Sequence, residues 1–552
     1  MRILVNSDRP IAPVSFDAVS INVLPRLEGR KRWTPQGLQF SATTHNLNLF
    51  QDELGFEIVD NRKLQTINDI KYDVPYKTRK KPEPHQVEAM KRSIKKTHFA
   101  FFMDVGTGKS FMFIWLMGLR YVNKLITGVI IISPKGVNYQ WIHEQIPMHI
   151  SKDIKWRGTI WRKKDSIERE ILEPCHNKLD ILSIHIDALD TKRGFDIIEQ
   201  FLDKHQGQVM IGLDEADLIK NYRAARTIAA MEFRDRARFR VEMTGTPVPS
   251  KLQDLWSELR WLDPDILGIE YVSTFRREYC IMGGYMNRSV VGYRDTERFQ
   301  KKIAPYIYSV SRADIGVLPP EYQRWRFDLG PKQRRLYDEI KAELKKELKD
   351  AGWSRDKKIG NRLMLLQQIG SGFITDADGK IIELGENPRA ENLIEMIDSR
   401  KPNKAIIWAR FHYDLDVIKH IVGEEGVEYS GRIDDETREM NKQIWLDPHS
   451  GIRFFYGTAA SGGVGLNLQG QCRYAFYYTN TYRARDRWQS EGRISRMGQF
   501  GPAEFIDLIA RDTNDSGILA NLRRKKNIQD LAIKEMKKVV DGAYEDYEFE
   551  FN

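Results

Sequence analysis

The sequence predicts an α/β protein in which two parallel-sheet units follow one another, after a small α+β N-terminal domain. Short apolar stretches alternate with helical stretches in two separate series, and a strongly charged helical segment divides the two series. Alternation of strand and helix is typical of a parallel sheet that is covered on both faces. The strands expected in the first series are FAFFMDV, GVIIIS, LDILSIHI, QVMIGLD and FRVEMTG, and those expected in the second are KAIIWAR, IRFFYGTA, YAFYYT and AEFIDLIA.

The stretches between these series set the expected domain boundaries. Residues 1–75 contain two strand-like stretches, SFDAVSINVL and GLQFSAT, then the helical stretch NLNLFQDELG, and lead into DIKYDVPYKTRKKPEP, which is typical of a linker. We expect the first sheet within 80–320, a helical connecting segment at 321–387 and the second sheet within 388–535. The final stretch, DGAYEDYEFEFN, has five acids and no base, which predicts a solvated acidic tail at 536–552.

The composition narrows the class of protein. With 41% hydrophobic and 30% charged residues, the 552-residue chain can bury several cores, which argues against a disordered protein. No apolar run reaches the length of about 18 residues that a membrane span needs, and the first residues lack a secretory leader. We therefore expect an intracellular protein with no membrane partner, in the cytoplasm or nucleoid of a bacterial or virus-infected cell.

Cysteine spacing and net charge add two further expectations. Cys175, Cys280 and Cys472 are too far apart in the sequence for clustered metal ligands and too few for a disulfide framework, so we expect three reduced thiols. The net charge of +10 favours a polyanionic partner.

A Gly-rich loop follows the first expected strand and precedes the helical stretch FMFIWLMGLR. Its residues are Gly106, Thr107, Gly108, Lys109 and Ser110. Glycines let backbone N–H groups wrap phosphate oxygens, and the helix N-terminus adds a favourable dipole. Lys109 would neutralise the terminal phosphates of ATP, and Ser110 would offer a hydroxyl to Mg²⁺. The strict phosphate-loop pattern has a glycine where Met103 stands, so an ordinary Gly-rich turn with a surface lysine is the alternative.

A second expected strand, QVMIGLD, ends in carboxylates about a hundred residues further on. Because a magnesium ion bound to phosphates needs an anchor at the end of a neighbouring parallel strand, we expect Asp214 to be the metal residue. Glu215 can orient and deprotonate the attacking water. Two half-motifs in this order predict an ATPase that uses ATP and Mg²⁺, whereas the alternative is a surface acid pair that caps the next helix.

Several stretches resemble, in their order, the helicase motifs of the SWI/SNF-like DNA translocases of helicase superfamily two. They are GTGKS, IISPKGVNYQWIHE, DEADLIKN, RVEMTGTPVPSKLQDLWSELRWLDPDILG, LPPEYQRWRFDLGPKQRRLY, KAIIWARFHYDLDVI, YGTAASGGVGLNL and QSEGRISRMGQ. The resemblance covers about residues 80–530 and is nearest to the annealing-helicase, or HARP-type, branch. It implies two RecA-like lobes and a DNA-dependent ATPase. The letters DEAD do not indicate an RNA helicase, since TGTP stands where those proteins carry Ser-Ala-Thr.

The same resemblance implies further nucleotide contacts. Gln86 matches the glutamine that reads the adenine edge, and Gly465 lies in a Gly-rich turn that contacts the nucleotide. Arg493 and Arg496 match the two arginines that reach the ATP phosphates from the second lobe, where fixed positive charge stabilises phosphoryl transfer. The sequence departs from the family at Asp217, where a histidine is usual, and at Gly492, where an aspartate is usual.

The resemblance also implies a DNA-binding strip. Its residues are Pro134, Lys135, Trp141, Thr244, Gly245, Ser461 and Gly462. Amides, hydroxyls and lysines suit tracking of the DNA backbone, because phosphates carry no base information. In the N-terminal domain, RKRW (Arg30, Lys31, Arg32 and Trp33) is similar to the HARP-type element that meets branched DNA. A basic hairpin whose Trp33 packs into a small core is the alternative.

These expectations combine into one favoured function. The chain would be an ATP-dependent double-stranded DNA translocase that acts on forked or branched DNA or remodels protein–DNA complexes. One alternative is a DNA-binding scaffold that switches shape on nucleotide binding with weak turnover. The other is a strand-separating helicase.

Overall fold

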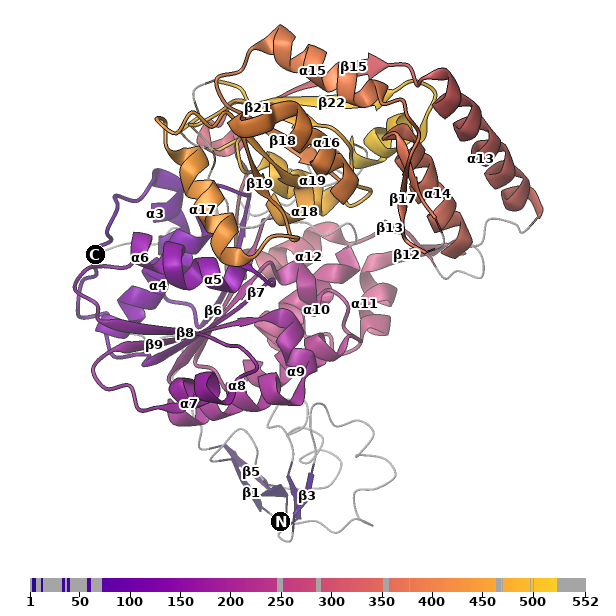
Figure 1. Ribbon diagram of the computed structural model, residues 1–552. Helices are drawn as coiled ribbons and strands as arrows, with labels where there is room; N and C mark the ends of the chain where they lie inside the picture. Colours follow the sequence, from indigo (N-terminus) through magenta and orange to yellow (C-terminus); the bar gives the residue numbers. More distant parts are fainter. Residues whose placement is uncertain are drawn as a thin grey trace. The chain divides into compact units, whose positions relative to one another are not determined.

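The computed structural model (Figure 1) describes residues 2–5, 11–12, 32–34, 37–39, 57–60, 72–245, 252–283, 289–350, 357–376, 378–462, 468, 470–496, 498–499 and 501–523. The chain divides into two compact units, and it passes from the first to the second between Val310 and Ser311. Each unit is built on a parallel sheet with helices packed over it. The predicted α/β class with two parallel sheets in tandem is therefore confirmed.

The first unit contains a seven-stranded sheet in which every neighbouring pair is parallel. Its strands in sheet order are β14 (Ile307–Val310), β6 (His98–Met103), β11 (Phe239–Thr244), β10 (Val209–Asp214), β7 (Gly128–Ser133), β9 (Leu179–His185) and β8 (Trp156–Ile160). All five predicted strands are present. The sequence missed β8 and β14, because β8 is a partly exposed edge strand and β14 has only four residues.

Helices and short turns connect these strands. The helices are α3 (Pro84–Ser93), α4 (Lys109–Val122), α5 (Val137–Gln140), the π-helix η3 (Trp141–Gln145), α6 (Ile146–His149), α7 (Asp165–Leu172), α8 (Lys192–Lys204), α9 (Ala225–Arg234), α10 (Leu252–Leu262), α11 (Val272–Tyr279) and α12 (Thr296–Ile303). Short 3₁₀ turns occur at η4 (Ile186–Asp190), η5 (Ala216–Ile219), η6 (Pro264–Ile266) and η8 (Ala304–Tyr306). An antiparallel hairpin joins β12 (Cys280–Gly283) to β13 (Ser289–Tyr293).

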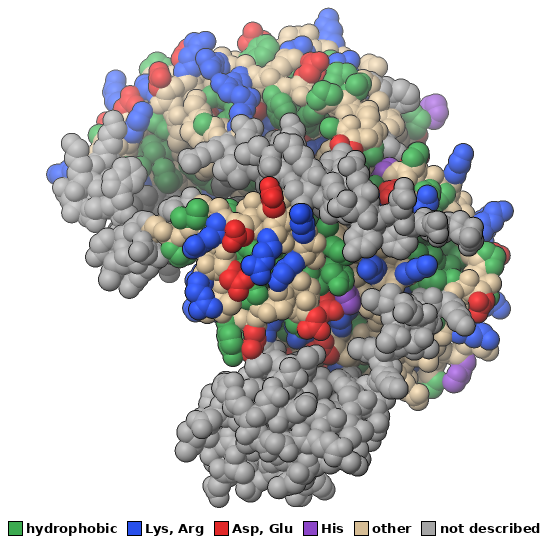
Figure 2. Space-filling view, turned by 180° about the vertical axis from the view of Figure 1, so that it is seen from behind, with side chains coloured by type: hydrophobic (Ala, Val, Ile, Leu, Met, Phe, Trp, Pro, Cys, Tyr) green, Lys and Arg blue, Asp and Glu red, His purple; other side chains and the backbone are tan. Residues whose placement is uncertain are grey.

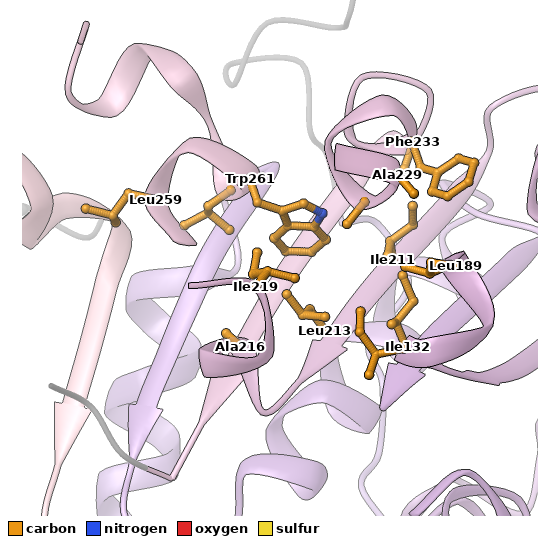
Figure 3. Close-up of a cluster of buried hydrophobic side chains, with 14 of the residues drawn as sticks. Ile132, Leu189, Ile211, Leu213, Ala216, Ile219, Ala229, Phe233, Leu259 and Trp261 are labelled. Carbon is orange, nitrogen blue, oxygen red and sulfur yellow. The ribbon is translucent and has the colours of Figure 1, made fainter. Parts of the chain in front are cut away.

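The core of the first unit lies between the sheet and its helices. Ile211 and Leu213 of β10 pack with Ile132, Phe233 and Trp261, all almost completely buried (Figure 3). The central strands are buried on both faces, which is why they read as unbroken apolar runs.

A close approach between helix α4 and strand β10 depends on a glycine. A Cβ atom added at Gly212 would lie only 2.4 Å from the ring of Phe113. Gly212 therefore lets the helix that follows the phosphate loop press against the strand that carries Asp214.

The second unit contains a six-stranded parallel sheet. Its strands in sheet order are β15 (Glu321–Phe327), β22 (Glu504–Ala510), β21 (Tyr474–Tyr477), β18 (Ala405–Ala409), β20 (Phe454–Thr458) and β19 (Gly426–Tyr429). Strand β15 belongs to this sheet although it lies within 321–387, the range expected to be a helical connection. Its alternating sequence EYQRWRF is mostly exposed at the sheet edge, so no apolar run marks it.

Helices and a small hairpin complete the second unit. The helices are α13 (Pro331–Asp350), α14 (Lys357–Gly370), α15 (Pro388–Arg400), α16 (His412–Val422), α17 (Asp435–Leu446), α18 (Ala459–Gly462) and α19 (Ala484–Glu491), with 3₁₀ turns η9 (Ala313–Ile315) and η10 (Gly423–Glu425). Strands β16 (Phe373–Thr375) and β17 (Ile381–Glu383) form the antiparallel hairpin.

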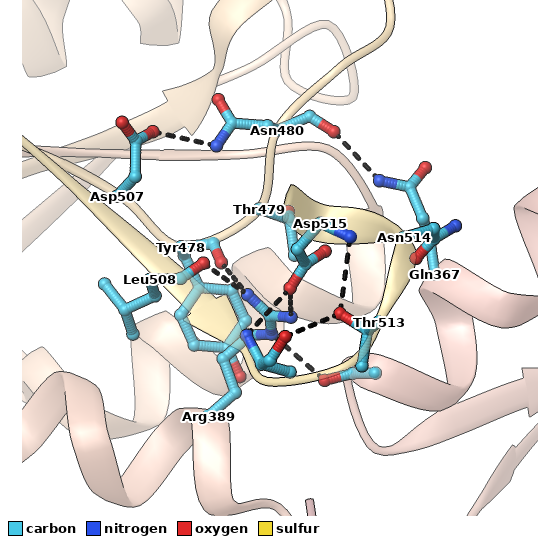
Figure 4. A network of polar contacts seen from close by, with 12 residues as sticks. Gln367, Arg389, Tyr478, Thr479, Asn480, Asp507, Leu508, Thr513, Asn514 and Asp515 are labelled. Atoms are coloured by element: carbon cyan, nitrogen blue, oxygen red, sulfur yellow. Dashed lines mark hydrogen bonds and ion pairs between the residues drawn. The ribbon is translucent and has the colours of Figure 1, made fainter. Parts of the chain in front are cut away.

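Buried polar contacts hold the carboxyl ends of the second sheet together (Figure 4). Arg389 of α15 is 1% exposed and donates to the carbonyls of Tyr478 and Leu508 at 2.7 and 3.0 Å. The same guanidinium pairs with Asp515 at 2.5 Å. One buried charge thus joins three segments that are far apart in the sequence, and its hydrogen bonds offset the cost of burial.

Short strands are described in the N-terminal 71 residues. Strands β1 (Arg2–Val5) and β5 (Glu57–Asp60) pair in parallel, and β2 (Ile11–Ala12), β4 (Gly37–Gln39) and β3 (Arg32–Thr34) form an antiparallel sheet. The expected strand SFDAVSINVL, the expected helix NLNLFQDELG and the expected tail at 536–552 lie outside the described residues.

Candidate nucleotide site

The Gly-rich loop connects strand β6 to helix α4, as the phosphate-site motif requires. Gly106 and Gly108 have φ angles of +90° and +100°, which L side chains rarely adopt, and Gly108 caps the helix. Thr107 is buried between them, and Ser110 lies half-buried in the first turn of α4. The loop therefore presents backbone amides and a helix N-terminus on one side of the sheet, an arrangement suited to binding phosphate.

The Lys109 side chain folds back over its own loop. Its ammonium donates to the carbonyl of Met103 at 2.8 Å and to that of Asp104 at 3.3 Å. Phosphate oxygens carry more negative charge than these carbonyls, so a bound triphosphate would compete for the same donor.

Gln86 lies beside this loop although it precedes it by twenty residues. A Cβ added at Gly108 would be 2.2 Å from the Gln86 amide nitrogen, so the side chain rests against the loop backbone. The side-chain oxygen Oε1 of Gln86 accepts a hydrogen bond of 3.0 Å from the backbone N–H of Glu83, which fixes the side chain at the start of α3. The structure thus brings Gln86 and the phosphate loop together, as the resemblance implies.

The carboxylates of the second half-motif lie at the end of β10. Asp214 accepts a hydrogen bond of 2.9 Å from the indole nitrogen of Trp141. Glu215 has a φ angle of +60° and a ψ angle of +65°, a left-handed conformation that costs a non-glycine residue free energy. Backbone strain of this kind is common at catalytic positions and here turns the chain sharply after the strand.

The chemistry of Ser110 and Asp214 fits magnesium. In nucleotide sites Mg²⁺ takes one carboxylate, a hydroxyl, phosphate oxygens and water in place of an all-protein cage. In the part of the chain that the structure describes, no group of three or more His, Cys, Asp and Glu side chains could hold a metal by itself. A magnesium ion at Ser110 and Asp214 would therefore depend on the phosphates.

The two arginines expected to reach ATP follow helix α19 of the second unit. Arg493 is 7% exposed, and the Arg496 guanidinium donates to the carbonyl of Gly492. Burial lowers the pKa of Arg496, and the nearby charges of Arg493 and Arg312 lower it further. Arg312 donates to the Ser495 carbonyl at 3.2 Å, so it joins this cationic cluster, which the sequence did not predict.

An ion-pair cluster anchors the helix that carries these arginines. Arg487 is 3% exposed and pairs with Asp507 and Glu491, and its guanidinium lies 3.3 Å from the centre of the Tyr477 ring. The hydroxyl of Tyr322 on β15 donates to Glu491 at 2.8 Å. Helix α19 is thereby fixed to the sheet directly before the arginine segment.

The expected DNA-binding strip is only partly at the surface. Lys135 is exposed and Pro134 is half-buried, at the carboxyl end of β7. Trp141 is 1% exposed, so the expectation that its side chain faces DNA is wrong, because the indole is committed to Asp214. Thr244 is also 1% exposed and Gly245 is buried, and their expected role as DNA contacts stays a prediction.

The structure describes some of the remaining expected site residues and leaves others outside the described ranges. Ser461 is half-buried, and its hydroxyl contacts Thr458 and the carbonyl of Tyr429; Gly462 ends α18. Arg32 and Trp33 lie on strand β3, which pairs with β4. Arg30, Lys31 and Gly465 lie outside the described residues.

Two buried glutamates lie on β11, the strand between β6 and β10, and on helix α10. Glu242 of β11 is 0% exposed and Glu258 of α10 is 1% exposed. Burial raises the pKa of Glu242 to about 8. Burial, followed by the charge of Glu242, also raises the pKa of Glu258. Two adjacent carboxylates cannot both ionise cheaply, so we infer that the pair holds at least one proton at neutral pH.

Because of this pair, we expect the free energy of unfolding to fall as pH rises. Because the folded pKa of Glu242 exceeds the unfolded value of 4.5, this contribution is complete below pH 4.5 and is lost as pH rises to about 8. Glu242→Gln should therefore be more stable than the native chain by on the order of a few kcal/mol at about pH 8.5 and similar to it at about pH 4.5. Thermal melts at both pH values, with exposed Glu297→Gln as control, test this; an unchanged pH dependence would contradict it.

Comparison with known proteins gives one family. The chain matches the SNF2-related domain family over residues 85–371, just over half of its length. A probable chromatin-remodeling complex ATPase chain of Oryza sativa subsp. japonica is 22% identical over 451 residues, which are 78% of this chain and 39% of that protein. SWI/SNF-related matrix-associated actin-dependent regulator of chromatin subfamily A member 1 of Mus musculus is 22% identical over 458 residues, 78% of this chain and 41% of that protein.

The chain therefore spans about two fifths of the length of these curated relatives. Among solved structures, the Sulfolobus solfataricus SWI2/SNF2 ATPase core in complex with dsDNA matches 87% of this chain and 100% of its own, at 19% identity and a TM-score of 0.39.

Of the helices that the structure describes, none has the length and apolar character to cross a membrane.

Proposed function

The chain belongs to the SNF2-related domain family, and on that premise we propose that it hydrolyses ATP to move along double-stranded DNA. One observation supports the proposal most strongly. Gly108 of the phosphate loop lies beside Gln86, while Asp214 ends the strand on which helix α4 packs and Glu215 comes directly after it. A purine reader, a phosphate cradle, a metal anchor and a base are the parts that ATP hydrolysis requires.

Each residue has one task in this proposal. Gln86 positions the adenine, and the amides of the phosphate loop hold the phosphates while Lys109 exchanges its carbonyl partners for phosphate oxygens. Glu215 orients the attacking water and takes its proton. Mg²⁺, when bound, would neutralise phosphate charge. Trp141 is a positioning residue, because its hydrogen bond fixes the Asp214 carboxylate.

Arg493 and Arg496 supply the remaining positive charge. They would stabilise the charge that develops on the transferred phosphoryl group when the second unit approaches the nucleotide. The buried ion pairs of Arg487 support this role, because they hold α19 rigid against the sheet. A fixed guanidinium loses little free energy to reorganisation during the reaction.

The net charge of the chain and the family to which it belongs both support DNA as a partner. The net charge is +10, and one relative above is named as a probable chromatin-remodeling complex ATPase chain. On the face that Figure 2 shows, the described Lys and Arg side chains are interspersed with Asp and Glu. Net charge alone therefore does not locate the binding surface, which has to be argued from individual residues such as Lys135.

Phosphate release measured with and without duplex DNA tests the function. We expect hydrolysis to require Mg²⁺ and to rise by about tenfold or more with duplex DNA, because the two units should close productively across a duplex. ATP binding without stimulated turnover would favour the nucleotide-switched scaffold instead. Full stimulation by single-stranded RNA and none by duplex DNA would indicate an RNA helicase.

A preference for forked or branched DNA is the finer part of the proposal, and it rests on Arg32 and Trp33 of strand β3. If Trp33 stacks on an exposed base, Trp33→Ala should weaken branched-DNA binding by about tenfold while duplex binding changes little, since one stack contributes about 1–3 kcal/mol. Affinities for fork and duplex measured side by side, with a melting curve of each protein, check this. Equal loss on both substrates with a lowered melting temperature would identify Trp33 as a packing residue.

A further inference from the structure

Residues Tyr72–Lys81, expected to be a linker, are an ordered part of the first unit. We name this segment the basic strap. The Tyr72 hydroxyl donates to the carbonyl of Ile94 at 2.7 Å. The Asn123 side chain exchanges two hydrogen bonds with the backbone of Val74, at 2.8 and 2.9 Å. Its first half is therefore attached at the carboxyl end of helix α4.

The second half of the basic strap continues along the same helix. The Tyr76 hydroxyl accepts from the Ser151 amide at 2.9 Å, and its ring lies so close to α4 that a Cβ at Gly118 would be 2.5 Å from it. Arg79 then donates to the carbonyl of Pro147 in α6. Since the chain next reaches Gln86 beside Gly108, the strap runs from the far end of α4 toward the phosphate loop.

This path places a run of cations beside α6. Lys77, Arg79, Lys80 and Lys81 are all exposed. Burial and, after it, the charges of Lys80 and Arg79 lower the pKa of His149 to about 4, which is consistent with the nearness of both cations to the end of α6. Figure 1 shows α3, α4, α5 and α6 grouped together over one face of the first sheet.

An exposed aromatic pair precedes α6. The rings of Tyr139 and His143 stack with centroids 4.1 Å apart and planes 30° apart. Tyr139 is 39% exposed, and His143 and Lys135 are also exposed. Because His143 is four residues before Pro147, the pair lies about one helical turn from the attachment of Arg79. The chain is a π-helix at this turn, a feature frequent at functional sites.

We propose that Lys80 and Lys81 of the basic strap, together with Lys135 and the Tyr139–His143 stack, bind the sugar–phosphate backbone of duplex DNA. The inference rests on the proposed function and adds a surface to it. Three exposed ammonium groups suit phosphates, and the stacked rings offer a flat apolar face to deoxyribose. None of these groups reads bases, so the surface suits a protein that must follow DNA of any sequence.

Two matched pairs of substitutions test the surface. Lys80→Gln with Lys81→Gln removes two charges from the strap, and Lys155→Gln with Lys178→Gln removes two exposed charges at the amino ends of β8 and β9, whereas Lys135 follows the carboxyl end of β7. Affinity for a labelled duplex is measured by fluorescence anisotropy over a salt series. We expect the strap variant to lower the slope of log affinity against log salt by about 1.8, or 0.9 per phosphate, and the control to leave it unchanged.

Tyr139→Ala provides a second readout, because it removes the ring and no charge. It should weaken duplex binding several-fold without changing the salt slope, while DNA-free ATP hydrolysis stays at the native rate in all these variants. The inference is overturned if the strap variant keeps the native slope or if the control loses as much. If the strap variant lowers the slope as expected while the native protein hydrolyses no ATP, the proposed function fails and the surface stands.

Discussion

Lys109→Ala and Glu215→Gln should each reduce ATP hydrolysis to the background rate, even with saturating duplex DNA. Lys109 is the charged side chain of the phosphate loop, and its ammonium already lies within 3.3 Å of two loop carbonyls, where phosphate oxygens would replace them. Glu215 would be the base that takes the proton from water. We expect losses on the order of 10³ or more for either variant, because one would remove the charge at the reacting phosphate and the other the base at the attacking water.

The two variants should differ in nucleotide binding. Lys109→Ala should bind ATP weakly, since it loses a charge that contacts phosphate in the ground state. Glu215→Gln should bind ATP normally, because the amide keeps the shape and removes only the base. Phosphate release and binding of a fluorescent nucleotide separate these effects, with exposed Lys91→Ala of α3 as the control. Native turnover in either variant would remove that residue from the reaction.

Arg493→Ala and Arg496→Ala should bind ATP and DNA yet lose turnover by about 10³–10⁵. In the proposed mechanism their charge acts mainly on the transition state, so kcat should fall while the KM for ATP changes little. Exposed Arg483→Ala, at the start of α19, is the matched control. A variant that kept the native kcat and raised only KM would show that its arginine binds nucleotide without stabilising the transition state.

Melting curves show whether a loss of turnover comes from unfolding of the variant. Arg487 is buried in ion pairs with Asp507 and Glu491, so Arg487→Ala should unfold the second unit at lower temperature. Arg493→Ala and Arg496→Ala, beyond the end of the helix, should leave the melting temperature within a few degrees of the native value.

The sequence predicted the strands that are buried on both faces. Strands such as β7 and β10 read as unbroken apolar runs because every side chain is covered. Strands β8 and β15 escaped prediction because edge strands carry polar side chains toward solvent. Their pairing depends on partners far away in the sequence, which local patterns do not contain.

In the candidate site, too, the sequence predicted some features and missed others. The positions of Lys109, Asp214 and Glu215 close to strand ends could be predicted, because phosphate and metal chemistry ties residue types to such positions. The burial of Trp141 could not be predicted, since a tryptophan in a helical stretch suits either a DNA face or a hydrogen bond to a carboxylate. The Glu242–Glu258 pair arises only when β11 and α10 pack together. A charged residue inside the strand FRVEMTG was the one available signal.

Displacement of a third strand from duplex DNA tests the central claim most directly. A labelled strand bound as a triplex near one end of a duplex should be released in an ATP-dependent manner by the native protein, because movement along the duplex removes it without separating the two strands. Glu215→Gln, which should bind ATP and DNA but not hydrolyse, should release none. We expect release to require hydrolysis and the duplex to remain intact; DNA-stimulated hydrolysis that leaves the third strand in place would contradict translocation.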